Sequence, residues 1–370
     1  MREISDRERL EEISHKFQIY GELLHAEVCK IGHINETYIA AYYQAGTRVR
    51  YIHQRINTDV FKNPAHVMEN VMRVTKHIRD TLRKKQIKEV TRRTLTLVPT
   101  RDGLPYYRDC YDNCWRTYFL IEDTRTYDVV KNERQAYQAG KAFGEFQNYL
   151  INLKGNRLYD TIPNFHNTPL RLETLYKAIE EDKFNRAAGV KREINFIKKH
   201  EAIAPILIRG LKDGSIPERI THNDTKFNNV MMDVKTDEAM CVIDLDTVMP
   251  GTVLYDFGDM VRTTTSSTTE DELNLSKVKA RTSMFQSLAK GYVESAGSFL
   301  TPKEKSLLTF AGKLITYTIA IRFLTDYLSG DVYFRVHRPF HNLDRCRTQL
   351  KLVESLERKE DEFQKFVDLL

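Results

Sequence analysis

Four polar side chains in one short stretch, THNDTKFNN at 221–229, have the types and the spacing that phosphoryl transfer requires. Asp224 can hold an acceptor hydroxyl in line and receive its proton, although a carboxyl with an ordinary pKa of about 3.9 acts mainly by orienting that hydroxyl. Lys226 is placed to neutralise charge on the transferred group, and Asn229 offers a neutral oxygen to a hard cation. His222 is expected to brace the loop. Together these residues form the pattern H-x-D-x₄-N, which predicts a catalytic loop.

Two carboxylates follow inside the otherwise apolar run CVIDLDTV. Asp244 is expected to bind a Mg²⁺ ion that bridges the phosphates of ATP, and Asp246 to share that ion or to hold a second one. Ile243 and Leu245 alternate with these carboxylates, which predicts a short strand that presents its polar side to a cleft. Each stretch alone has an ordinary interpretation, a capped turn and a strand end. Their order and spacing together predict two halves of one site that uses ATP and Mg²⁺.

A third acidic stretch, YDFGDMVRT at 255–263, contains the letters DFG but lies too far from Asp224 to be the metal motif. We expect Asp256 to brace the catalytic loop through hydrogen bonds to its backbone. The alternative, an aspartate that caps the next helix, is equally compatible with the pattern.

The nucleotide side of the predicted site is less sharply marked. Gly32, in IGHINETY at 31–38, permits close approach of the backbone to a phosphate, although an ordinary turn is the alternative. Arg55 takes the place on the third strand that is usually given to a lysine, with Glu69 as its expected partner. No G-x₄-G-K-[ST] motif occurs, which excludes a P-loop enzyme. The residues expected to contact the nucleotide, the last two through the adenine, are Gly32, His33, Asn35, Thr37, Arg55, Glu69, Phe119 and Ile121.

The elements that must position these groups fall into two lobes. Residues 3–28 look helical, 29–57 have the alternation of a hairpin, a helix follows from about residue 64, and 91–122 contain two or three further strands. Helical periodicity dominates afterwards. We therefore expect an α+β, protein-kinase-like two-lobe fold, with a small antiparallel β-rich lobe at 1–123 that binds the nucleotide. A larger α-helical lobe at 124–370 is expected to carry the catalytic and sugar-binding residues.

Composition narrows the class of protein. A chain of 370 residues with a net charge of +6 is expected to form two domains and lacks the concentrated basic face of a nucleic-acid binder. No apolar run is long enough to span a membrane, and the N-terminus has no signal-peptide core, so we expect a cytoplasmic protein. The five cysteines are expected to be free thiols. We expect a monomer or a weak homodimer with a small-molecule substrate, and neither a nucleic-acid nor a membrane partner.

Several of these stretches together resemble the aminoglycoside phosphotransferase superfamily and, within it, the N-acetylhexosamine 1-kinases. The stretches that carry the resemblance are GHINETY, YIHQRIN, HNDTKFNNVMMD, CVIDLDTVMPGTVLYDFGDMVRT and RFLTDYLSGDVYF. The resemblance implies ATP- and Mg²⁺-dependent phosphorylation of the anomeric hydroxyl of N-acetylglucosamine or N-acetylgalactosamine. It further implies that Asp224, Arg322 and Tyr333 contact the sugar.

The last two residues also make physical sense without the resemblance. Arg322 lies among apolar residues and needs an acceptor, which a sugar hydroxyl or an acetamide oxygen can supply. Tyr333 offers both a ring face and a hydroxyl. The alternative for Arg322 is an internal ion pair with Asp326, one helical turn later. Two other functions remain open: the same chemistry on choline, homoserine or an aminoglycoside, and a nucleotide-binding pseudokinase.

Overall fold

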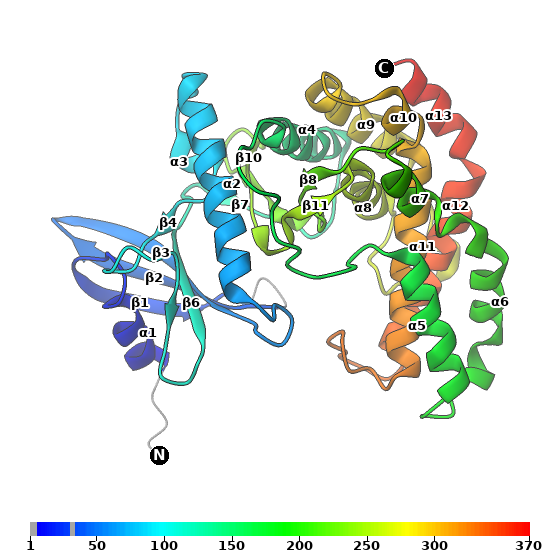
Figure 1. The fold of residues 1–370 in the computed structure, drawn as a ribbon, viewed down its shortest axis with the longest axis horizontal. Helices are drawn as coiled ribbons and strands as arrows, with labels where there is room; N and C mark the ends of the chain where they lie inside the picture. Colours follow the sequence, from blue (N-terminus) through cyan, green and yellow to red (C-terminus); the bar gives the residue numbers. More distant parts are fainter. Residues whose placement is uncertain (1–5, 30–33) are drawn as a thin grey trace. The chain divides into compact units, whose positions relative to one another are not determined.

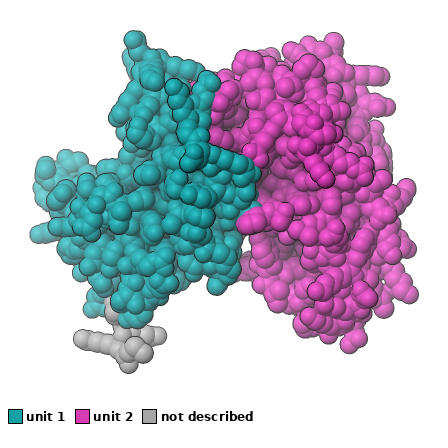
Figure 2. All heavy atoms as spheres, viewed as in Figure 1, with its two compact units in different colours: residues 1–124, 152–162, 240–249 teal, residues 125–151, 163–239, 250–370 magenta. Residues whose placement is uncertain are grey.

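The structure, a computed structural model, describes residues 6–29 and 34–370. These residues form two compact units, which Figure 2 colours separately. The first unit comprises Met1–Thr124, Asn152–Ile162 and Met240–Met249, and the second comprises Arg125–Ile151, Pro163–Ala239 and Pro250–Leu370. The sequence predicted one division, at 123/124, whereas the first unit also contains two later segments of the chain.

The first unit is built on an antiparallel sheet of six strands in the order β1-β2-β3-β6-β4, with β5 paired to β6 (Figure 1). Its described elements, in chain order, are α1 (Asp6–Ser14), β1 (Glu22–Val28), β2 (Glu36–Gln44), β3 (Thr47–Ile56), α2 (Pro64–Lys84), α3 (Val90–Arg93), β4 (Leu97–Val98), β5 (Tyr107–Arg108), β6 (Cys114–Phe119) and the 3₁₀ helix η4 (Leu245–Thr247).

Local sequence signals account for the hairpin and for the long helix of this unit. The β2–β3 turn places Ala45 and Gly46 at φ values of 45° and 84°, the positive angles that two-residue hairpin turns favour. Helix α2 begins after Asn63, whose side chain accepts a hydrogen bond from the backbone N–H of His66 at 3.3 Å, and Pro64 occupies its first turn. The predicted hairpin and the predicted start of the helix are both present.

Two predicted elements of the first unit are wrong. Residues 22–28 were expected to be helical but form β1, an edge strand that is exposed along most of its length and so lacks the alternation of a half-buried strand. In the stretch 91–122, the first of the expected strands was to begin at residue 91, but helix α3 ends at Arg93 and only Leu97–Val98 pair with β6. Pairing across the sheet decided both segments, and local periodicity does not record it.

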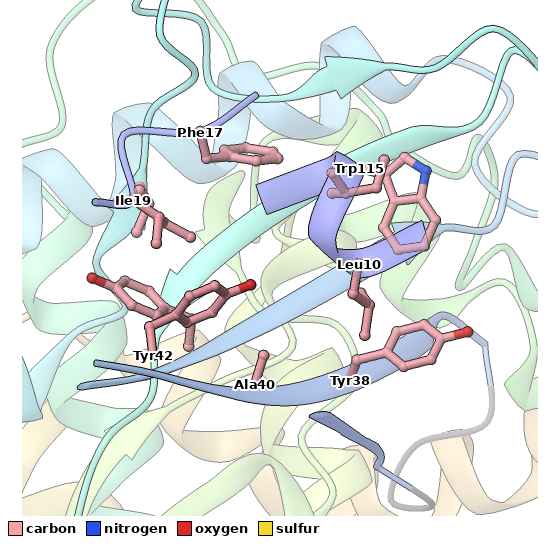
Figure 3. Close-up of a cluster of buried hydrophobic side chains, with 10 residues drawn as sticks. Leu10, Phe17, Ile19, Tyr38, Ala40, Tyr42 and Trp115 are labelled. Carbon is pink, nitrogen blue, oxygen red and sulfur yellow. The ribbon is translucent and has the colours of Figure 1, made fainter. Parts of the chain in front are cut away.

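The core of this unit lies on one face of the sheet, under α1 (Figure 3). Alternate residues of a strand face opposite sides, so the buried core residues identify the face to which their strand neighbours belong. Trp115 packs in this core, whereas the next residue, Arg116, lies on the other face, where its guanidinium contacts Met68 of α2. The core members are Leu10, Ile13, Phe17, Ile19, Tyr38, Ala40, Tyr42, Tyr51, Val98 and Trp115.

The second unit is mainly helical (Figure 1). Its described helices are α4 (Glu133–Leu150), α5 (Thr168–Glu181), η1 (Ala187–Val190), α6 (Lys191–His200), η2 (Glu201–Ile203), α7 (Ile206–Asp213), η3 (Phe227–Asn229), α8 (Val253–Thr265), η5 (Leu275–Lys277), α9 (Thr282–Ala296), α10 (Pro302–Ser306), α11 (Leu308–Leu328), α12 (His341–Arg358) and α13 (Glu360–Asp368). Two small sheets complete the fold: β10-β9-β7, made of β10 (Ala239–Val242), β9 (Val230–Asp233) and β7 (Thr124–Arg125), and β11-β8, made of β11 (Met249–Gly251) and β8 (Arg219–Thr221).

Close packing of α4 against α9 sets the frame around the predicted catalytic loop. A Cβ atom on Gly140 would lie 2.2 Å from the carbonyl oxygen of Leu288, and a Cβ on Gly291 would lie 2.2 Å from that of Tyr137. Glycine at both positions therefore lets the two helix backbones approach each other directly. Among the helices of the described ranges, none is both long enough and apolar enough to cross a membrane.

Candidate active site

The catalytic loop of the second unit is held by Asp256, a fully buried residue in the first turn of α8. Its Oδ2 accepts a hydrogen bond from the backbone N–H of His222 at 2.9 Å, and its Oδ1 accepts one from the backbone N–H of Asn223 at 2.7 Å. Gln147 of α4 donates to the same carboxylate at 2.7 Å. Burial raises the pKa of Asp256, against the opposing effect of these donors. The bracing contact expected of Asp256 is therefore present.

His222 fixes the loop from inside the protein. Its ring is fully buried and meets the rings of Phe143 and Phe146 edge-on, at centroid distances of 5.4 Å and 5.8 Å. The next residue, Asn223, has a φ of 67°, a left-handed conformation that asparagine tolerates better than most residues. The backbone N–H of Asp224 then lies 3.3 Å from Nδ1 of His222. His222 thus acts as an internal support for the backbone that carries Asp224.

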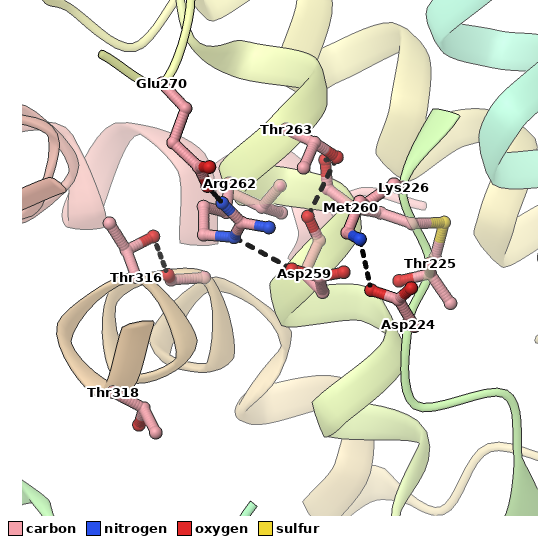
Figure 4. Close-up of polar contacts among 12 residues, drawn as sticks. Asp224, Thr225, Lys226, Asp259, Met260, Arg262, Thr263, Glu270, Thr316 and Thr318 are labelled. Atoms are coloured by element: carbon pink, nitrogen blue, oxygen red, sulfur yellow. Dashed lines mark hydrogen bonds and ion pairs between the residues drawn. The ribbon is translucent and has the colours of Figure 1, made fainter. Parts of the chain in front are cut away.

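Asp224, Lys226 and Asn229 come together at the surface of this loop (Figure 4 shows the first two). The ammonium of Lys226 lies 3.1 Å from Oδ1 of Asp224, and their side chains are 43% and 19% exposed. Burial acts to raise the pKa of Asp224, but the ammonium of Lys226 and the other positive charges nearby lower it overall. The same pair raises the pKa of Lys226. At neutral pH the loop therefore presents a carboxylate next to an ammonium.

The amide of Asn229 has a defined orientation. Its Nδ2 donates to the backbone carbonyl of Asp224 at 2.8 Å and lies 3.4 Å from Oδ2 of the same residue. Because the amide nitrogen is used inside the loop, the amide oxygen is the atom left for a ligand. A neutral oxygen of this kind suits Mg²⁺, so the donor set of Asn229 fits its predicted role.

A second cluster of the same unit joins Arg322 of α11 to the loop after it. The guanidinium carbon of Arg322 lies 5.2 to 5.5 Å from the ring centroids of Phe165, Tyr333 and Phe334, and one of its nitrogens lies 3.3 Å from the hydroxyl of Tyr333. The alternative ion pair with Asp326 is absent. Asp326 instead accepts hydrogen bonds from the backbone N–H groups of residues 332–334 at 2.8 to 3.0 Å, which fixes the segment that carries Tyr333.

His166 connects this cluster to the catalytic loop, and the sequence did not single it out. Its Nε2 lies 2.9 Å from the carbonyl oxygen of Asn223, so that nitrogen must carry the proton. Burial lowers the pKa of His166 to about 4, which keeps the ring neutral. Its neighbour Phe165 packs on Arg322. Because His166 lies in an Asn- and Pro-rich loop, no periodic pattern marks it, and only its contact with residue 223 indicates its place.

Asp246, in the first unit, does not fit the role of a metal ligand. It is 1% exposed and forms a two-point ion pair with the equally buried Arg116, with 2.9 Å between Nη2 and Oδ2. The side-chain amide of Asn35 also donates to Oδ2, at 2.7 Å. Burial acts to lower the pKa of Arg116, but the carboxylate of Asp246 raises it overall. The protein itself uses both oxygens of Asp246, so the metal role predicted for this residue is wrong.

Asp244 differs sharply from Asp246. Its side chain is exposed, and its φ of 60° places it in the left-handed region just before η4. The predicted strand with alternating carboxylates is therefore wrong, because β10 ends at Val242. Its exposure on a tightly turned backbone is compatible with the predicted role of a Mg²⁺ ligand, which stays a prediction.

The predicted pairing of Arg55 with Glu69 is also wrong. Arg55 lies four residues after the core residue Tyr51 on β3 and so shares the α1 side of the sheet, where it binds Glu36 and Asn113, each at 2.9 Å. Glu69 instead lies 3.8 Å from Arg73 on its own helix. The strand period places Gln54, not Arg55, on the opposite face, where its Nε2 donates to the hydroxyl of Thr37 at 3.0 Å.

The other residues predicted to contact the nucleotide differ in whether the structure describes them and in how exposed or hydrogen-bonded their side chains are. Gly32 and His33 lie outside the described residues. Asn35, besides donating to Asp246, accepts a hydrogen bond from the backbone N–H of Asn57 at 3.0 Å, so its amide is used inside the first unit. Thr37 accepts from Gln54 and keeps its hydroxyl proton for another acceptor. In the connector, Phe119 is 41% exposed and Ile121 only 6%.

Comparison with known proteins bears on the class of chemistry. The model of the Phosphotransferase enzyme family matches residues 32–289. The fold is similar to that of a microcompartment-associated aminopropanol kinase, with a TM-score of 0.62 and 16% identity over 97% of this chain and 99% of the other. It is equally similar, at 0.62 and 12% identity, to an aminoglycoside phosphotransferase from Alicyclobacillus acidocaldarius, with 100% and 98% covered. A spectinomycin phosphotransferase in complex with ADP gives 0.58 and 12%, with 98% and 100% covered.

At these identities the solved structures show a common fold, which is the kinase-like fold expected from the sequence. The family match covers well over half of the chain and includes the catalytic loop, both carboxylates of IDLD and Asp256. The protein therefore belongs to the phosphotransferase enzyme family, whose members include the aminoglycoside phosphotransferases.

Proposed function

We propose that this protein is a kinase that transfers a phosphoryl group from ATP, with Mg²⁺, to the anomeric hydroxyl of an N-acetylhexosamine. The products would be the sugar 1-phosphate and ADP. The observation that carries the choice of a sugar is the environment of Arg322. Within the described ranges its guanidinium has aromatic rings and the Tyr333 hydroxyl as neighbours and no carboxylate as an ion-pair partner.

A second guanidinium supports the same choice. Arg171 donates to the backbone carbonyls of residues 164 and 165, and burial and the charge of Arg322 lower its pKa. Two positive groups within electrostatic reach of each other disfavour an ammonium at this place and favour a neutral acceptor of hydrogen bonds, such as an acetamide oxygen. Amino alcohols, which carry an ammonium, are therefore the less suitable acceptors.

The transfer itself follows from the residues of the loop. The acceptor oxygen forms a bond to the γ-phosphorus, the bond between that phosphorus and the ADP oxygen breaks, and the hydroxyl proton passes to the carboxylate of Asp224. Lys226 offsets the negative charge on the transferred group. In the loop, the amide oxygen of Asn229 is the group that would hold Mg²⁺; the metal role expected of Asp244 stays a prediction. A bound Mg²⁺ would neutralise charge on the nucleotide phosphates.

The test is a panel of acceptors followed by phosphorus NMR of the product. With ATP and Mg²⁺, N-acetylglucosamine or N-acetylgalactosamine should give a phosphate coupled to the anomeric proton, whereas glucosamine, choline, ethanolamine and aminopropanol should react poorly. Turnover confined to the amino compounds would refute the sugar assignment. Lack of turnover with every acceptor of the panel would also refute the sugar assignment and would favour a nucleotide-binding pseudokinase.

A pair of arginine variants sharpens this test. Arg322→Gln should raise the KM for the sugar roughly tenfold or more, the value expected for one lost hydrogen bond from a charged group, and leave the KM for ATP unchanged. Arg192→Gln, at an exposed arginine of α6, is the matched control and should leave both KM values unchanged.

A further inference from the structure

A buried carboxylate oxygen next to the catalytic loop has no hydrogen-bond partner among the residues that the structure describes. It belongs to Asp259 of α8, whose side chain is only 4% exposed. Oδ1 of Asp259 accepts a hydrogen bond from Nε of Arg262 at 2.8 Å, and Arg262 in turn contacts Glu270 at 2.5 Å. Oδ2 is the buried atom without a partner. Leaving such an atom unsatisfied costs stability, so its position points to a ligand.

The direction of this oxygen identifies the ligand. Figure 4 shows the Asp259 carboxylate between Arg262 on one side and the Asp224–Lys226 pair on the other. The charged groups that act on the ammonium of Lys226 are first Asp224 and then Asp259, both of which raise its pKa, with Arg262 opposing them. Two carboxylates therefore attract the same ammonium, and only Asp224 contacts it here.

The contact with Asp224 conflicts with the role proposed for that residue. One oxygen of Asp224 has the ammonium of Lys226 at 3.1 Å, and the other has the amide of Asn229 at 3.4 Å. An acceptor hydroxyl must donate its hydrogen bond to one of these oxygens before transfer. A positive charge bound to the same oxygen occupies one of its lone pairs and weakens it as a proton acceptor. Movement of the ammonium away from Asp224 would therefore strengthen this oxygen as an acceptor.

We propose that Asp259 is a positioning residue for the transfer reaction: its Oδ2 receives the Lys226 ammonium when an acceptor hydroxyl takes over Oδ1 of Asp224. This inference rests on the proposed kinase activity. The lysine keeps its proton throughout, because the hydroxyl proton goes to Asp224. In its second position the ammonium remains beside the loop, and the unpartnered oxygen of Asp259 gains its hydrogen bond.

A double-mutant cycle tests this proposal. The variants are Asp259→Asn, Lys226→Met and the combination of both, each assayed for kcat with saturating ATP, Mg²⁺ and the best acceptor of the panel. If Asp259 acts through Lys226, Asp259→Asn should lower kcat about tenfold in the native background and less than about twofold when Lys226 is already methionine. The KM for ATP should not change.

Glu270→Gln is the matched control, because it removes one negative charge from the far side of Arg262 and should change kcat less than about twofold. Equal effects of Asp259→Asn in the two backgrounds, or a native kcat in Asp259→Asn, would overturn the proposal. If Asp259→Asn does not fold, Asp259→Glu takes its place in the same cycle, and equal effects in both backgrounds would again overturn it. If the native protein has no kinase activity, both the proposed function and this inference are overturned. If the native protein is active, the double-mutant cycle tests the role of Asp259 alone.

Discussion

Replacing Asp256 by asparagine should separate the support of the catalytic loop from its chemistry. The carboxylate accepts three hydrogen bonds while fully buried: two at Oδ2, from the backbone of His222 and from Gln147, and one at Oδ1, from the backbone of Asn223. Asparagine has the same shape but only one acceptor atom. Its better orientation keeps the oxygen at the two-donor position and turns its NH₂ group toward the N–H of Asn223.

The expected loss of stability follows from the loss of one acceptor atom. One buried donor left without an acceptor costs about 1–3 kcal/mol, so we expect a loss of about 2 kcal/mol in the free energy of unfolding. For a domain of the size of the second unit, this loss corresponds to a fall of roughly 4–8 °C in the midpoint of thermal unfolding. Since the affected N–H group directly precedes Asp224, kcat should fall as well, whereas the KM for ATP should stay near its native value.

Calorimetry and steady-state assays of the purified variant measure both effects. Asp80→Asn, at an exposed ion pair on α2, makes the same chemical change at the surface and should alter neither the midpoint nor kcat. A midpoint and a kcat equal to those of the native protein in Asp256→Asn would show that these hydrogen bonds do not support the loop.

The remaining predictions concern single charges. Lys226→Gln removes the ammonium that helps to keep the pKa of Asp224 low in the free enzyme, so the acidic limb of the kcat/KM–pH profile should move to higher pH; an unmoved limb would contradict the pairing. Arg116→Met strands the buried carboxylate of Asp246 and should destabilise the protein by about 3–5 kcal/mol, measured by urea unfolding, with Asp246→Leu in the same chain restoring part of the loss. Asp326→Ala frees the segment after α11 and should raise the KM for the sugar but not that for ATP; a change in both KM values would indicate general damage.

The catalytic loop was predictable because its chemistry is local. Asp224, Lys226 and Asn229 lie within six residues, and one turn of backbone brings them together. The contact of Asp256 crosses 33 and 34 residues of chain, and the sequence accordingly left it as one of two alternatives. The hairpin and the start of α2 carry their own turn and capping residues.

The errors arose where contacts join distant parts of the chain. Asp246 is paired with Arg116, 130 residues earlier, and no local pattern shows that a carboxylate in an apolar run already has a partner. Arg55 was assigned to the wrong side of its strand because a period of two residues does not say which side holds the core. His166 was missed because its single informative contact, with Asn223, crosses 57 residues of chain that include α5, α6 and α7.

The composition of the first unit has a consequence for how this protein can be divided. The chain passes between the two units at 124/125, 151/152, 162/163, 239/240 and 249/250, so neither unit is one continuous piece. A fragment that stops at residue 124 would contain Arg116 but not the carboxylate that neutralises it. It would have to bury an unpaired guanidinium or open the face of the sheet on which Arg116 lies. The small unit therefore cannot complete its own interior during synthesis until residue 246 has been made. Its folding thus depends on the polypeptide between residues 124 and 246.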